Sequence, residues 1–124
     1  THMTNSRLTD PEILETRFPV VLEDFHLRRG SGGRGRWSAG DGTSRTLRAR
    51  ERLDFAIRSG HRRVPPFGLR GGEAGALGIN RVRRNDGSIE TLPGAAHTVL
   101  EAGEAFTVIT PTGGGWGRPD DPHA

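Results

Sequence analysis

The first seven residues carry the densest group of side chains that could bind a small polar molecule. The stretch HMTNSR places a histidine, two hydroxyls, an amide and a guanidinium within six positions. A histidine can carry a proton near neutral pH, and an arginine can bind a carboxylate through two parallel hydrogen bonds. We therefore predict a substrate-binding set made of His2, Thr4, Asn5 and Arg7. The alternative is an irregular segment whose polar side chains bond to the nearby backbone, and the residue types alone favour that alternative.

Two glycine-rich stretches, residues 61–78 and 110–117, could in principle surround a phosphate group. A phosphate loop needs backbone N–H groups, a following lysine, serine or threonine, and a helix that begins directly behind it. The stretch GGGWGRPDD has no lysine and no helical pattern after it, and GGEAGALG lacks the strand-to-helix context of a dinucleotide site. We therefore predict turn and close-packing roles for these glycines, and no bound cofactor in this chain. The length of the 61–78 loop indicates a functional segment or an interface.

Signatures of metal binding and of nucleophilic catalysis are missing from the sequence. The five histidines are scattered along the chain: His2, His26, His61, His97 and His123. No one element would hold several of them at ligand spacing and there is no cysteine, so we predict no metal site. No G-x-S-x-G motif occurs, and Ser31 lies in a GSGG stretch typical of a hairpin loop. The residues alone therefore name no catalytic group.

The composition favours a β-rich soluble domain over a nucleic-acid or membrane protein. The chain has 18 arginines and no lysine. Its formal net charge is +3, and its sequence pI is about 11.1. The arginines alternate with acidic residues, as in RARERLD, so we predict exposed strand faces and no nucleic-acid partner. No apolar run approaches the roughly 20 residues that span a bilayer, and no signal peptide is recognisable. We expect no membrane association and a cytoplasmic location.

A short helix is expected near the N-terminus, because TDPE has the form of a capping box. Thr9 would cap the helix, Pro11 would lie in its first turn, and Glu12 would reach back to the cap. Pro19 disfavours helical geometry at Phe18, so the helix should end there.

Beyond that helix the apolar residues recur with a period of two, which predicts strands. The stretch VVLEDFHL should place Val21, Phe25 and Leu27 on one face, and RLDFAIRS alternates in the same way. INRVRR and SIETL flank an NDG turn, which predicts a hairpin. In HTVLEAGEAFTVIT, Phe106 and Val108 should point one way and the residues between and after them the other.

These patterns predict a mainly β fold with a short N-terminal helix and some seven or eight strands. The fold class we expect is an antiparallel sandwich or a distorted barrel. We place a single β-rich domain at residues 1–117 and a polar tail at residues 118–124.

Four ordered blocks of sequence carry a resemblance to a known family. They are THMTNSRLTDPEILETRFPV, LRRGSGGRGRWSAGDG, PPFGLRGGEAGALGIN and TPTGGGWG, and together they run from residue 1 to about residue 117. The blocks are similar to the C-terminal part of ATP-dependent 5-oxoprolinases, in the half that resembles hydantoinase B. One departure is visible: Thr112 and Trp116 stand where the family has a glycine and a tyrosine.

The resemblance implies that the chain is a C-terminal piece of a longer enzyme. That enzyme would open the lactam of 5-oxo-L-proline to L-glutamate while converting ATP to ADP and phosphate, a reaction of glutathione metabolism. ATP would bind outside this chain, in a hydantoinase A-like half carried on the same chain or on a partner subunit. The isolated piece would then be inactive, and Asn5 and Arg7 would be placed to bind an amide and a carboxylate.

Two alternatives remain beside that expectation. The chain could be a non-catalytic docking or assembly domain, which a surface cluster of Trp37, Phe67 and Trp116 would favour. It could also come from an N-methylhydantoinase or caprolactam-type relative with the same ATP-dependent chemistry. A concave pocket around Asn5 and Arg7 would favour substrate contact.

Overall fold

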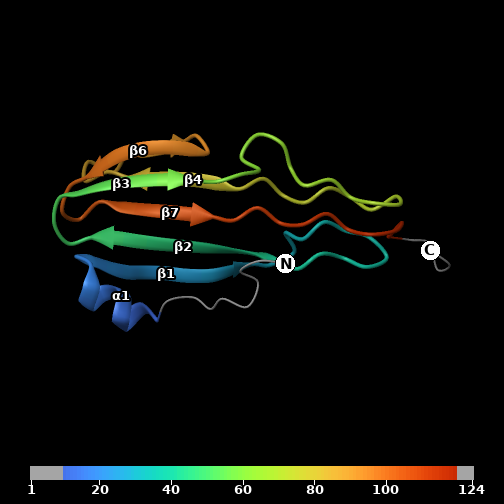
Figure 1. The fold of residues 1–124 in the computed structure, drawn as a ribbon, viewed down its shortest axis with the longest axis horizontal. Helices are drawn as coiled ribbons and strands as arrows, with labels where there is room; N and C mark the ends of the chain where they lie inside the picture. Colours follow the sequence, from blue (N-terminus) through green and yellow to red (C-terminus); the bar gives the residue numbers. More distant parts are fainter. Residues whose placement is uncertain (1–9, 120–124) are drawn as a thin grey trace.

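The computed structural model describes residues 10–119 and has two antiparallel sheets with one short helix (Figure 1). The elements are α1 (Pro11–Arg17), β1 (Val20–Arg28), β2 (Gly42–Ala49), β3 (Leu53–Arg58), β4 (Ile79–Arg83), β5 (Ile89–Leu92), β6 (Ala95–Leu100) and β7 (Ala105–Ile109). Five strands form one sheet in the order β1-β2-β7-β4-β5, and β3 pairs with β6 in a second sheet. The mainly β, antiparallel prediction is confirmed, and the two sheets do not close into a barrel.

The helix is as short as the flanking prolines require, but a different residue caps it. Asp10 is the N-cap, and its side chain accepts a hydrogen bond from the Glu12 backbone N–H at 2.9 Å. The cap expected at Thr9 is therefore wrong by one position, because the carboxylate of Asp10 already serves that N–H. Phe18 adopts an extended conformation directly after the helix, as Pro19 dictates.

Strand β1 contains a bulge that changes which of its side chains share a face. The pairing with β2 shifts between Leu22 and Asp24, so one extra residue lies in β1. Before the bulge Val21 pairs with Arg48 and Leu22 with Leu47, whereas Phe25 afterwards pairs with Arg45. The prediction that Val21 shares a face with Phe25 is therefore wrong, because strict alternation does not hold across a bulge.

The core lies between the two sheets. Phe106 is almost fully buried, and its ring stacks on Phe55 of β3 with 4.2 Å between the ring centroids. Leu53, Phe55 and Ile57 pack against the buried cluster while the residues between them are exposed, which confirms the alternation predicted for β3. The small sheet covers only part of this face, and a hollow of about 240 Å³ remains beside Phe25.

Two turns required by the sequence are present. Gly87, at the NDG turn, has φ of 87° and joins β4 to β5 as a hairpin. Gly103 has φ of 91° and lies between β6 and β7, which belong to different sheets. Glycine adopts this conformation at little cost, so the second turn can pass the chain from the small sheet to the large one. No helix within residues 10–119 has the length and apolar character needed to cross a membrane.

Three segments extend together beyond the ends of the strands and form what we call the arm (Figure 1). The arm consists of residues 29–41, 61–78 and 110–119. Backbone hydrogen bonds join the first to the third segment and the second to both of the others. The arm thus brings together three glycine-rich stretches that are far apart in the sequence.

Candidate functional site

The arm is held together by contacts between bare backbones, which explains its glycines. A Cβ atom on Gly75 would lie 1.9 Å from the carbonyl oxygen of Thr112, and one on Gly115 would lie 2.2 Å from that of Arg34. Such distances leave no room for a side chain, as at the crowded axis of the collagen helix. The close-packing role predicted for these glycines is confirmed.

The same packing occupies the N–H groups that a phosphate loop would need. The N–H of Gly33 donates to the oxygen of Gly113, and that of Gly115 donates to the oxygen of Glu73, both at 2.9 Å. The N–H groups of Gly30 and Gly32 donate to the carboxylate of Asp41. These bonds lower the pKa of Asp41, the one from Gly32 most strongly. The donors therefore close the arm upon itself and are not directed at a ligand.

Thr112 joins all three segments of the arm through its hydroxyl. The residue is 4% exposed, and its Oγ1 accepts a hydrogen bond from the Ala76 N–H at 2.6 Å. The same hydroxyl donates to the carbonyl oxygen of Ser31 at 2.7 Å. The hydroxyl of Thr112 thus supplies a specific cross-link between the segments.

Large apolar side chains gather on the arm and form what we call the arm patch: Trp37, Phe67, Leu69 and Trp116. Trp37 and Phe67 are 64% and 76% exposed. Trp116 forms an antiparallel bridge with Trp37 and a parallel bridge with Leu69, so these residues lie side by side. The Arg36 guanidinium lies 5.7 Å from the Trp37 ring centroid, within the range of a cation–π contact. Trp37 and Trp116, two of the three residues named for the docking alternative, thus lie side by side.

The arm also carries a net positive charge. Seven of the 17 arginines in residues 10–119 lie on it, with only two of the 13 carboxylates. The arm therefore has a formal charge of +5, and the rest of the described chain has −1. An apolar patch on a positively charged arm is suited to an acidic protein surface.

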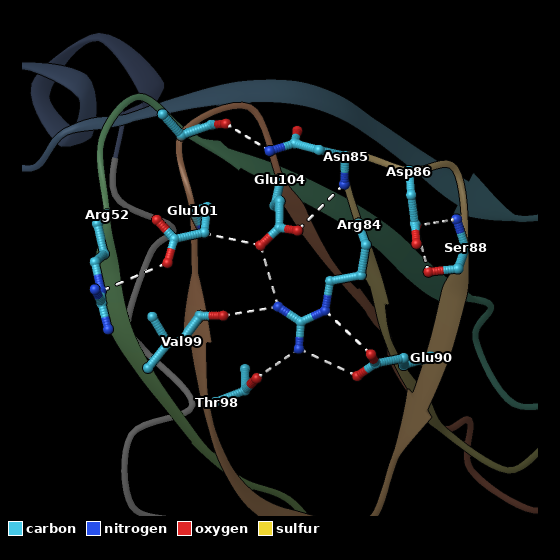
Figure 2. Close-up of polar contacts among 11 residues, drawn as sticks. Arg52, Arg84, Asn85, Asp86, Ser88, Glu90, Thr98, Val99, Glu101 and Glu104 are labelled. Carbon is cyan, nitrogen blue, oxygen red and sulfur yellow. Dashed lines mark hydrogen bonds and ion pairs between the residues drawn. The ribbon is translucent and has the colours of Figure 1, made fainter.

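A polar cluster lies around Arg84, directly after the end of β4 that points away from the arm (Figure 2). Arg84 forms a bidentate pair with Glu90 at 3.1 and 3.2 Å and donates to Glu104 at 3.1 Å. Its other two N–H groups donate to the Val99 carbonyl and the Thr98 hydroxyl. All five donors of the guanidinium are therefore in use, and the cluster joins β4, β5 and β6 without leaving a group for a ligand.

Glu104 is the buried carboxylate of that cluster. It accepts hydrogen bonds from the backbone N–H of Glu101 at 2.8 Å and of Asn85 at 3.2 Å, as well as from Arg84. The Glu101 N–H is the largest of the causes that lower the pKa of Glu104. The carboxylate is thus held ionised as a structural group, which is the opposite of what a general acid needs.

The four residues predicted to bind substrate, His2, Thr4, Asn5 and Arg7, lie outside the described residues. The hydroxyl of Ser31 donates to the Arg28 carbonyl and accepts from the Gly42 N–H, so it belongs to its own loop. Within residues 10–119 no three histidine, aspartate or glutamate side chains are grouped as metal ligands. Leu69 of the arm patch was not predicted, since no sequence pattern marks its bridge to Trp116 more than forty positions away.

Comparison with known proteins identifies the family to which the chain is similar. Residues 1–119 match the family described as hydantoinase B/oxoprolinase. A 5-oxoprolinase from Pestalotiopsis fici is 44% identical over 124 residues, which cover 96% of this chain and 10% of that relative. 5-Oxoprolinase 1 from Arabidopsis thaliana is 44% identical over 116 residues, covering 94% of this chain and 9% of that relative.

A solved structure agrees with this relationship. The crystal structure of an ATP-dependent caprolactamase from Pseudomonas jessenii matches with a TM-score of 0.76 at 26% identity, over 89% of this chain and 20% of that chain. The chain thus spans about a tenth of the length of the curated relatives it matches. The resemblance carried by the four sequence blocks is confirmed, and the chain belongs to the hydantoinase B/oxoprolinase family.

Proposed function

We propose that this chain is a domain of an ATP-dependent cyclic amide hydrolase that opens 5-oxo-L-proline to L-glutamate and converts ATP to ADP and phosphate. The observation that carries the proposal is the identity of 40–44% to three 5-oxoprolinases over nearly the whole chain. Related ATP-dependent enzymes act on other cyclic amides, as the name of the caprolactamase indicates. An N-methylhydantoinase or caprolactam-type substrate is therefore the second candidate.

The coupling to ATP has a chemical reason. The carbonyl carbon of a γ-lactam is a poor electrophile, because the ring nitrogen donates electron density into the carbonyl group. Transfer of the γ-phosphoryl group to the lactam oxygen would withdraw electron density and make the carbonyl carbon more electrophilic. Water could then attack that carbon, and the C–N bond would break as the nitrogen takes a proton, which opens the ring and leaves γ-glutamyl phosphate. A second water would hydrolyse this acyl phosphate to glutamate and phosphate.

We further propose that ATP binds outside this chain, in a hydantoinase A-like half of the enzyme. The occupied N–H groups of the arm support this, since they bond to Asp41 and to carbonyl oxygens. We also propose that residues 1–117 form one domain and that residues 118–124 are a polar tail. The enzyme would lie in the cytoplasm and take part in glutathione metabolism.

The contribution of the chain to such an enzyme would be assembly, and the arm patch supports it. Four large apolar side chains exposed together on a surface of charge +5 fit an acidic surface of the catalytic body. Docking through the arm is compatible with a role in substrate binding for the N-terminal residues. His2, Thr4, Asn5 and Arg7 remain the residues proposed for that role, with Arg7 bound to the substrate carboxylate.

The reaction is tested by incubating the longer protein that carries this chain with ATP and each of three substrates: 5-oxoproline, hydantoin and caprolactam. We expect ATP-dependent release of glutamate from 5-oxoproline, and no release by the 124-residue chain alone. Turnover of hydantoin or caprolactam in place of 5-oxoproline would favour the second candidate. Arg7→Ala should raise KM for 5-oxoproline about tenfold, and an unchanged KM would reject its proposed role.

A further inference from the structure

A basic hollow lies beside the end of β3, away from the Arg84 cluster. It has a volume of about 340 Å³ and is lined by Ser59, His61, Arg62, Arg63, Val64 and Gly94. Three of these side chains can carry positive charge and none can carry negative charge. His61 also has a φ of 54°, a left-handed conformation that is uncommon outside glycine. The lining is therefore suited to an anion.

Arg62 is held in one orientation by a buried amide. Asn80 is 0% exposed, and its Oδ1 accepts hydrogen bonds from Nε of Arg62 at 3.2 Å and from Nη2 at 3.0 Å. The Asn80 Nδ2 donates to the Ser59 hydroxyl and the Pro93 carbonyl, which fixes the amide with its oxygen toward Arg62. A guanidinium positioned in advance loses less entropy when it binds a ligand.

The charge of Arg62 has no carboxylate beside it within residues 10–119. Its acceptors are the Asn80 amide oxygen and the Gly60 carbonyl, both neutral. These bonds leave one N–H on Nη1 and one on Nη2, whereas Arg84 has none left. Partial burial, and after it the charge of Arg28, lower the pKa of Arg62.

Arg28, the last residue of β1, contacts the backbone next to Arg62. Its Nη1 donates to the carbonyl oxygen of Leu77 at 3.2 Å. The next residue, Gly78, lies against Arg62, because a Cβ on Gly78 would be 2.2 Å from Nη1. The described acceptors of Arg28 are carbonyl oxygens as well. Two guanidinium groups thus flank one stretch of backbone without a counter-charge.

We propose that the basic hollow binds a small oxyanion, a carboxylate or a phosphate group, through Arg62 with Arg63 and His61 at its rim. The two remaining N–H groups of Arg62 match two oxygens of either anion. Binding would also offset the repulsion between the guanidinium groups. The inference does not rest on the proposed function, because it is tested on the chain without ATP or turnover.

The test is an amide and guanidinium NMR titration of the 124-residue chain with inorganic phosphate, acetate and 5-oxoproline, each against sodium chloride of equal ionic strength. We expect saturable shifts confined to residues 59–64 and Gly94. Arg62→Gln should weaken binding roughly tenfold. Arg58→Gln is the matched control, since Arg58 is exposed on β3 outside the hollow, and it should bind as the parent chain does.

Two further variants keep the test decisive if Arg62→Gln disturbs the fold through Asn80. Arg63 is exposed, so Arg63→Gln should weaken binding a few-fold while the melting curve stays the same. Gly78→Ala keeps both charges but forces the Arg62 guanidinium to move, and it should also weaken binding. Saturation by phosphate alone identifies a phosphate site, and saturation by acetate and 5-oxoproline identifies a carboxylate site. Shifts that rise linearly with anion concentration and spread over all exposed arginines would overturn the proposal. So would Arg62→Gln and Arg63→Gln variants that bind the anion as tightly as the parent chain does.

Discussion

Arg84 and Arg62 are both partly buried, yet their partners give them different roles. Arg84 uses all five N–H groups, two of them on Glu90 and one on Glu104. Arg62 has neutral partners and two donors left over. Sequence alone could not separate the two, because Glu104 lies twenty positions from Arg84 and Asn80 eighteen from Arg62. What distinguishes a structural arginine from a binding one is thus set by strand pairing.

The lowered pKa of Glu104 predicts a pH-dependent contribution to stability. A carboxylate whose folded-state pKa is lowered stabilises the fold at pH values above its unfolded pKa, and this stabilisation is lost as the pH falls through the folded-state pKa. Glu104→Gln should therefore reduce the free energy of unfolding by about 1–3 kcal/mol at neutral pH. The difference from the parent chain should shrink in acid.

Urea unfolding over a pH series measures this difference. Glu51→Gln is the control, since Glu51 is exposed and should show little effect at any pH. If the free energy of unfolding differs between Glu104→Gln and the parent chain by the same amount at every pH, the structural role given to the ionised carboxylate is contradicted.

The Thr112 hydroxyl gives a second prediction for a single residue. Thr112→Val keeps the shape of the side chain but removes the acceptor of the Ala76 N–H. A buried donor left without a partner costs about 1–3 kcal/mol, so thermal unfolding should move to lower temperature. Thr112→Ser retains the hydroxyl and should recover most of the loss. Equal stability of the valine variant and the parent chain would show that the cross-link is unimportant.

At the scale of the elements, alternation predicted most strands and failed where the backbone departs from it. The stretch Leu53–Arg58 alternates as expected because it pairs with β6 without a bulge. In β1 the extra residue near Glu23 reverses the faces, and no residue type marks it in the sequence. The helix cap was misplaced because two adjacent residues, Thr9 and Asp10, are both good caps.

The glycines of the arm were recognisable in the sequence, but their partners were not. GGG and GG runs indicated close packing, whereas only the fold shows that Gly75 faces Thr112 and Gly115 faces Arg34. Three extended segments separated by whole strands must meet for the arm to form. Its glycines should therefore differ sharply in their tolerance of a methyl group.

Gly75→Ala and Gly40→Ala test that expectation as a matched pair. Neither glycine has positive φ, and a Cβ on Gly40 would meet no atom within 4 Å, against 1.9 Å at Gly75. Gly75→Ala should lower the free energy of unfolding by about 3 kcal/mol or more, and Gly40→Ala should stay within about 0.5 kcal/mol. Chemical denaturation of both variants gives the comparison. If the two variants lost similar amounts of unfolding free energy, the packing described for the arm would be contradicted.

At the scale of the whole molecule, the described residues expose apolar side chains on the arm patch and also on β1. On β1, Phe25 and Leu27 are exposed, and Phe25 lines a hollow together with Phe55 of the small sheet. Composition predicted an Arg-rich β domain, but it gave no sign that a charge of +5 is confined to the arm. That asymmetry depends on which segments meet, and it supports the proposed docking to an acidic surface.

The central claim, that this chain is a docked domain required by an ATP-dependent cyclic amide hydrolase, is tested most directly by adding the chain back in trans. The longer protein is prepared without these 124 residues, and ATP-dependent conversion of 5-oxoproline to glutamate is measured with increasing amounts of the separate chain. We predict that the truncated protein is inactive and that activity rises to saturation as the chain is added. A Trp37→Ser, Phe67→Ser chain, altered only in exposed residues of the arm patch, should need a higher concentration for the same rate. Full activity of the truncated protein without the chain would contradict the claim.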